Sequence, residues 1–169
     1  MMNIKNFLNG ADRYITENKT TLEFAEFTVP LKCEPGSKGG SVNKDELESF
    51  VKDGSNPGFS EVLFGFVDKS GMSDSEIYKT AGVDRRIFSK IRCYDTYIPK
   101  KKTIIAICMA MELSRDETDT VLRAAGYTLS NSDTFDLIIM YCIENKIYSI
   151  AEINIALEHY NLELFNTEE

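Results

Sequence analysis

The order of apolar and polar positions along the chain predicts a series of short helices after residue 58. Between Phe59 and Gly71 the apolar side chains recur three or four positions apart, which is the spacing of one helical face, and the segment ends at a glycine. The apolar run 135–143 also predicts a helix. The segment 100–112 is predicted to be a helix with one apolar face, made of Ile104, Ile107, Cys108 and Met111.

Short motifs that start helices divide the same part of the chain. A serine followed three positions later by glutamate is the pattern of a capping box, and it occurs at Ser73-x-x-Glu76, Ser114-x-x-Glu117 and Ser149-x-x-Glu152. The first of these helices is predicted to run to Ala81-Gly82 and the second to end at Gly126. Asp84 is the predicted N-cap of a further helix over 85–92. Three motifs of one kind favour an all-α fold.

The first 58 residues show a mixed pattern. Helices are predicted over 5–16 and 42–51, whereas residues 21–29 alternate with period two, as a strand does. Residues 33–41 have the glycine and serine content of a linker, and the turn-forming residues 53–58 mark a boundary. We therefore predict three parts: a loosely packed N-terminal segment of mixed structure at 1–58, a helical domain at 59–127 and a C-terminal helical pair at 128–169.

The segment 72–91 has the spacing of a helix-turn-helix. It places a capped helix, the tight turn Ala81-Gly82-Val83 and a second capped helix within twenty residues. Val83, Phe88 and Ile91 are predicted to face the core. The outer face of the second helix then carries side chains suited to phosphates and base edges, namely Arg85, Arg86, Ser89 and Arg92.

With this motif, residues 59–125 resemble the lambda-repressor-like, Cro-type (XRE) helix-turn-helix family. The stretch from Pro99 through Lys100, Lys101 and Lys102 to Glu117 is similar to that family's fourth helix and the turn into the fifth. The resemblance implies a five-helix domain with helix 84–92 in the DNA major groove. It also implies that Arg85, Arg86 and Ser89 occupy base- or phosphate-facing positions.

Three departures from the family pattern favour a different use of the same fold. Asp74 stands where the family often has a phosphate-contacting glutamine, and Asp84 stands at a common serine position. The loop 93–98 lacks the usual glycine and is one residue longer. The alternative is a protein-interaction module, such as an antitoxin-like or defence-system accessory subunit, with weak or no DNA binding.

The charges are distributed unevenly along the chain. The 169 residues have a formal net charge of −8, but residues 130–169 carry −7 of it, and the segment 84–102 carries +5. A basic segment inside an acidic protein is consistent with an oriented phosphate contact, and the alternative is a solvated basic face that pairs with the protein's own acidic tail. The predicted DNA-binding residues are Arg85, Arg86, Ser89, Lys90, Arg92, Tyr94, Tyr97, Lys100 and Lys101.

The composition narrows the remaining function classes. With 43% hydrophobic and 27% charged residues the chain is predicted to fold, and it lacks both a secretory signal and a run long enough to span a membrane, so we expect a cytoplasmic protein. One histidine and four scattered cysteines offer no recognisable metal site, and we expect no metal, no cofactor and no enzymatic activity.

These observations together predict a sequence-specific DNA-binding transcriptional regulator. Its expected partner is double-stranded DNA. The region 133–165 holds more apolar side chains than two helices need, so it is predicted to pack on the preceding helices, to bind a second copy or another protein, or to do both. A symmetric dimer would present two recognition helices to two half-sites.

Overall fold

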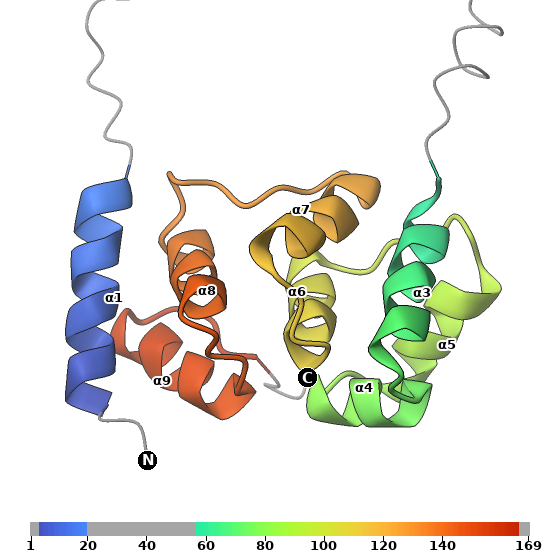
Figure 1. Cartoon of the computed structure of the whole chain (residues 1–169), viewed down its shortest axis with the longest axis horizontal. Coiled ribbons are helices and arrows are strands. Elements are labelled where there is room, and N and C mark those ends of the chain that lie inside the picture. Colours follow the sequence, from blue (N-terminus) through green and yellow to red (C-terminus); the bar gives the residue numbers. More distant parts are fainter. Residues whose placement is uncertain (1–3, 20–56, 166–169) are drawn as a thin grey trace, which may run out of the picture. The chain divides into compact units, whose positions relative to one another are not determined.

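The computed structural model describes residues 4–19 and 57–165, which form helices and their connections (Figure 1). No strand occurs among these described residues, as the all-α prediction requires. The predicted strand at 21–29, linker at 33–41 and helix at 42–51 lie outside them. The helices are α1 (Ile4–Asn18), α3 (Phe59–Ser70), α4 (Asp74–Thr80), α5 (Arg85–Cys93), α6 (Lys101–Ala110), α7 (Arg115–Ala124), α8 (Thr134–Glu144) and α9 (Ile150–His159).

Two of the three predicted capping boxes form. The Ser73 backbone N–H donates to the Glu76 carboxylate at 2.8 Å, and the Glu76 backbone N–H donates to the Ser73 hydroxyl at 3.3 Å. Glu117 accepts in the same way from the Ser114 N–H at 2.9 Å. The Ser73 N–H and hydroxyl hold the pKa of Glu76 below its usual range, and the Ser114 hydroxyl and N–H lower that of Glu117 in the same way.

The third predicted capping box is wrong, although α9 begins where it was expected. Ser149 occupies the N-cap position but makes no side-chain capping hydrogen bond. Glu152 is half-buried, and its charge adds to burial in raising the pKa of the Cys142 thiol of α8 to about 12. The motif therefore predicts the start of α9 correctly, but not the hydrogen bonds of a capping box.

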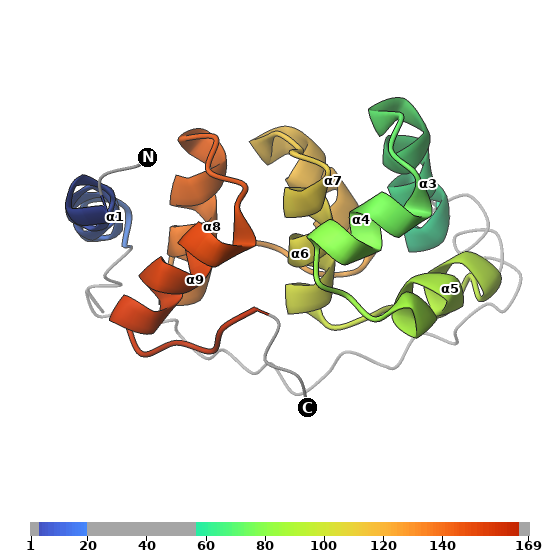
Figure 2. The same cartoon turned by 90° about the horizontal axis from the view of Figure 1, so that it is seen from below.

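Helix α6 is the most completely buried helix of the group α3 to α7. This helix is buried from Ile104 to Ala110, on more sides than the single apolar face that the sequence predicted. It contacts α4 and α7, while α3 contacts α7 and α4 contacts α5 (Figure 2). A helix buried on all sides gives its neighbours a fixed support, so α4 and α5 are held against a rigid core.

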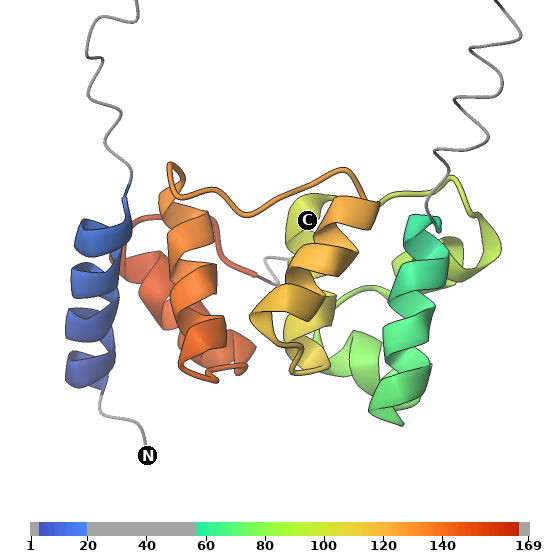
Figure 3. The ribbon, with the colours of Figure 1, turned by 45° about the horizontal axis from the view of Figure 1, so that its top comes forward.

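Helix α1 packs on α8, which is distant from it in the sequence (Figure 3). It buries Phe7, Ala11 and Ile15 along one face. Gly10 lies against the Tyr141 ring so closely that a Cβ there would stand 2.1 Å from the Tyr141 hydroxyl oxygen. This part of 1–58 is therefore tightly packed, contrary to the prediction of a loosely packed segment, because its apolar face complements α8.

Two tyrosine hydroxyls also fasten α1 to the C-terminal helices. Tyr14 donates to Glu144 at 2.7 Å, and Tyr160 donates to Asp12. Burial, followed by the hydrogen bond to Glu144, raises the pKa of Tyr14 to about 12. Burial and the hydrogen bond to Asp12 likewise raise the pKa of Tyr160. Both hydroxyls therefore stay protonated and remain donors across the physiological range.

The apolar residues of 133–165 are largely buried inside the chain. They form the core between α8, α9, α1 and α7, which accounts for the surplus of apolar side chains that the sequence left open. The partner surface predicted there stays a prediction. Among the described helices, none has the length and apolar content needed to cross a membrane. Large side chains of 133–165 that are fully buried are Leu137, Ile138, Ile139 and Ile153.

Candidate nucleic-acid interface

The turn between α4 and α5 is fixed by backbone hydrogen bonds. The Gly82 N–H donates to the Lys79 carbonyl at 3.1 Å and the Val83 N–H to the Tyr78 carbonyl at 2.8 Å, the pattern of a Schellman cap. Gly82 has a φ of 61°, a left-handed conformation that favours glycine. Ala81 before it is completely buried. The sequence prediction of a tight turn at these residues is confirmed.

Helix α5 is anchored along its inner face and at both ends. Phe88 and Ile91 are buried, as predicted. At the start of α5, the Arg86 backbone N–H donates to the Asp84 carboxylate at 2.6 Å, so Asp84 caps its own helix. At the other end, the buried Ser60 hydroxyl of α3 donates to the Ile91 carbonyl at 2.9 Å. These contacts fix which side chains of α5 face outward.

The outer face of α5 carries five of the predicted DNA-binding residues, which form two rows along the helix. All five are exposed, namely Arg85, Arg86, Ser89, Lys90 and Arg92. Arg85, Ser89 and Arg92 follow one another at helical spacing and line a cleft of about 320 Å³ against α4. Arg86 and Lys90 form the neighbouring row, because they are four positions apart. Both rows of the outer face of α5 therefore offer hydrogen-bond donors to a ligand, from arginine, lysine and serine side chains.

Arg92 is held by two neighbours. Its guanidinium donates to the Asp74 carboxylate of α4 at 2.7 Å, and its central carbon lies 3.9 Å from the centre of the Phe64 ring of α3. Both side chains of the ion pair are about half exposed, so the pair is worth less than about 1 kcal/mol. Asp74, which stands where the family often has a phosphate-contacting glutamine, is thus partly neutralised by Arg92, and both side chains line the cleft.

The loop after α5 places its two tyrosines differently. Tyr94 is 62% exposed, whereas Tyr97 is half-buried against the core. The Lys90 ammonium lies 5.7 Å from the centre of the Tyr97 ring, a distance at which the ring face attracts a cation. Tyr94 is therefore available to a ligand, while Tyr97 supports the orientation of Lys90.

The predicted lysines at the start of α6 differ in exposure and in ion pairing. Lys100 is exposed, but the Lys101 ammonium donates to the Asp136 carboxylate of α8 at 2.6 Å. Asp136 is only 1% exposed, and it also accepts from the Ser130 N–H at 2.8 Å. Lys101 is therefore part of an internal ion pair rather than of the exposed basic face. Its partner is 35 residues away, and no local pattern in the sequence indicates it.

Neighbouring Lys102, which the sequence prediction left out of the site, pairs with Glu163 at 3.0 Å. The two ion pairs of this helix start thus draw on acidic residues from the C-terminal third. Lys101 and Lys102 therefore behave as the alternative prediction stated, since both pair with acidic residues of the same chain.

Possible metal ligands and cysteine thiols add no further site among the described residues. Within 4–19 and 57–165, no three histidine, cysteine, aspartate or glutamate side chains gather closely enough to hold a metal ion. Burial raises the pKa values of the Cys108 and Cys142 thiols to about 12, so both are protonated and unreactive, while Cys93 at the end of α5 is exposed.

Comparison with known proteins gives no relative. The chain matches no family model, no curated protein and no solved structure. The functional argument therefore rests on the geometry of α4 and α5.

Proposed function

We propose that this protein is a sequence-specific DNA-binding transcriptional regulator that places α5 in the major groove. The observation that carries the proposal is the outer face of α5, where Arg85, Arg86, Ser89 and Lys90 are exposed while the opposite face is anchored in the core. The major groove accepts an α-helix, and arginine makes the commonest specific contact there, two hydrogen bonds to guanine.

The surrounding helices support the same proposal. In it, α4 and α5 form a helix-turn-helix, and α3, α6 and α7 complete the order of the lambda-repressor-like family that the sequence resembles. Lys100 and Tyr94, both exposed beside α5, would contact the phosphate backbone. Phosphate contacts position a protein on DNA, and base contacts then supply the specificity.

The salt dependence of DNA binding tests this function. Sites are selected from random double-stranded DNA with the full chain, and the binding constant is measured by fluorescence anisotropy over a range of salt concentrations. With about four phosphate contacts, the logarithm of the constant should fall with the logarithm of salt concentration at a slope near −3.6. A slope near zero contradicts the proposal.

A charge-matched pair of variants localises the binding. Arg85→Ala with Arg86→Ala should abolish specific binding, because it removes two exposed cations from the proposed reading helix. Lys79→Ala with Arg123→Ala removes the same charge from α4 and α7 and should retain it. Equal binding by both double variants would refute the role of α5.

One observation favours a second candidate, a protein-interaction module. The cleft between α4 and α5 contains the Asp74 carboxylate together with Arg85 and Arg92. A surface of mixed charge suits a protein partner better than a phosphate backbone. In that case a pull-down with the full chain should recover a stoichiometric partner that Asp74→Arg fails to capture, and selected DNA should not bind.

A further inference from the structure

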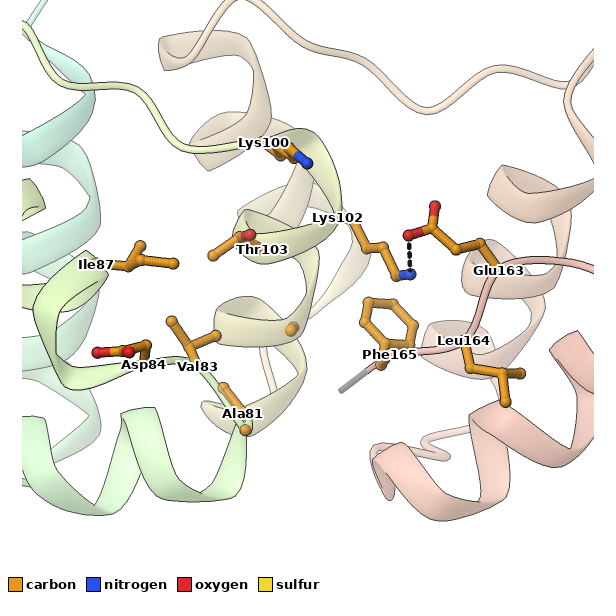
Figure 4. A pocket seen from close by; sticks show the side chains of 12 residues that line it. Ala81, Val83, Asp84, Ile87, Lys100, Lys102, Thr103, Glu163, Leu164 and Phe165 are labelled. Carbon is orange, nitrogen blue, oxygen red and sulfur yellow. Dashed lines mark ion pairs between the residues drawn. The ribbon is translucent and has the colours of Figure 1, made fainter. Parts of the chain in front are cut away.

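A second groove, here called the turn groove, opens on the other side of the start of α5. Its walls are the α4–α5 turn and the C-terminal segment Glu163–Phe165, and α6 lies between them. Figure 4 shows Val83, Asp84 and Ile87 on one side and Phe165 on the other, with Thr103 between. The Asp84 carboxylate in this wall already accepts the Arg86 N–H as the cap of α5. The volume of about 220 Å³ is below the roughly 300–1,000 Å³ of sites for drug-sized ligands, so an occupant must be small.

The C-terminal wall of the turn groove is held in place. The Asn154 side chain of α9 donates to the Phe165 carbonyl at 3.0 Å and accepts from the Phe165 N–H at 2.8 Å. The Phe165 ring is buried, and its centre lies 5.7 Å from that of the Phe135 ring. A groove with fixed walls binds without a large ordering cost.

The mouth of the turn groove is a place where negative charge is stabilised. Lys102 donates to the Glu163 carboxylate at 3.0 Å, and this hydrogen bond, with a further contribution from the charge of Lys100, holds the pKa of Glu163 below its usual range. The Glu163 side chain is 80% exposed, so its ion pair is weak and another carboxylate can replace it.

From this combination we propose that the turn groove binds a small carboxylate with a short apolar body. Lys100 and Lys102 hold the carboxylate, which displaces Glu163, and the apolar body lies against Val83, Ile87 and Phe165. Lysine ammonium groups provide charge and donors without fixing a planar geometry, which suits a flexible small anion.

The position of the turn groove gives its ligand a route to α5. Val83 and Ile87 belong to the turn and to the first half of α5, so an occupant connects this helix to the C-terminal segment. If the proposed DNA-binding function holds, on which this step alone rests, ligand and DNA change each other's affinity by the same factor.

A titration without DNA tests the site itself. In the full chain with labelled isoleucine and valine methyl groups, butyrate should cause saturable chemical-shift changes at Val83 and Ile87. Butyramide lacks the charge and inorganic phosphate lacks the apolar body, so each should bind at least about tenfold more weakly. The absence of a saturable butyrate shift, or equal binding of either comparison ligand, overturns the proposal.

Variants then assign the contacts. Lys100→Gln with Lys102→Gln should weaken butyrate binding at least about tenfold, and Glu163→Gln should strengthen it because it removes the competing carboxylate. Lys79→Gln, on α4 outside the turn groove, is the matched control and should bind as the unaltered chain does. An amide spectrum checks that each variant is folded, and unchanged affinity in both lysine and glutamate variants refutes the assignment. Because DNA is absent, this outcome is independent of the DNA-binding test.

Discussion

The basic segment 84–102 divides into two parts that share a charge and differ in their surroundings. On α5, the side chains of Arg85, Arg86 and Lys90 are exposed around an anchored helix. At the start of α6, Lys101 and Lys102 meet Asp136 and Glu163 from the C-terminal third of the chain. The net charge of a sequence segment therefore does not give the charge of the surface it forms, because ion pairs with distant residues decide which cations remain available to a ligand.

Burial explains why the two parts differ. The Asp136 carboxylate is almost completely buried, and an unpaired charge there would be strongly unfavourable, so it requires a cationic partner. Lys101 supplies that partner from α6. No such carboxylate faces the row formed by Arg86 and Lys90 among the ion pairs of the described residues. This row is consequently the part of the basic segment best suited to DNA.

The largest expected effect is the loss of the buried pair. Lys101→Ala leaves Asp136 buried without its cation and should lower the free energy of unfolding by about 3 kcal/mol. Urea denaturation followed by circular dichroism measures this change. Lys100→Ala, one position earlier and exposed, should change it by less than about 0.5 kcal/mol. Equal losses of stability in the two variants would contradict the claim that Lys101, unlike Lys100, neutralises a buried carboxylate.

The next largest difference between the two parts is expected in DNA affinity. Arg86→Gln should weaken binding by about 1–2 kcal/mol, roughly tenfold, whereas Lys102→Gln should change it less than twofold because the Lys102 side chain is only 24% exposed and is not on α5. Anisotropy titrations with a selected site give both values. An equal loss in the two variants would mean that the lysines of α6 also contact DNA.

A smaller effect should come from the carboxylate on the α4 side of the cleft. Asp74→Asn removes a charge that opposes phosphate and releases Arg92, so DNA binding should strengthen by roughly 0.5 kcal/mol at low salt. The free energy of unfolding should fall by no more than about 0.5 kcal/mol, since the pair is half exposed. Weaker binding in this variant would show instead that Asp74 holds Arg92 in its DNA-contacting position.

The smallest expected change concerns the titration of Glu163. Lys102→Gln removes its hydrogen-bond donor, so the pKa of Glu163 should rise toward its usual range, as followed by carboxyl carbon NMR. A carboxyl pKa that is lowered in the folded protein stabilises it above the ordinary pKa, and this stabilisation is lost as the pH falls through the lowered value. An unchanged pKa would remove Lys102 as the cause.

The local elements could be predicted because their causes are local. The Ser73 capping box, the Asp84 cap and the left-handed Gly82 each depend on atoms within a few positions, and the structure shows all three. The motif at Ser149 has the same residue types, and α9 begins there, yet Ser149 makes no side-chain capping hydrogen bond. A local motif therefore predicts where a helix begins more reliably than it predicts the hydrogen bond of its cap.

The outer face of α5 was predictable for the same reason, since helical spacing separates Phe88 and Ile91 from the arginines. What spacing cannot show is the state of each cation. Arg92 interacts with Asp74, 18 residues away, and Lys101 with Asp136, 35 residues away. The predicted site therefore agrees with the structure for the exposed face of α5, whereas Lys101 does not belong to it because it pairs with Asp136.

The sequence by itself determined that the described chain is helical, where most helices begin and end, and which face of α5 is polar. Hydrogen bonds and apolar periodicity within a few residues carry that information. Only the tertiary structure decided that α1 packs on α8, that α6 is buried on all sides from Ile104 to Ala110, and that Lys101 pairs with the buried Asp136. Those outcomes depend on shape and charge complementarity between distant segments, which periodicity along the chain does not encode.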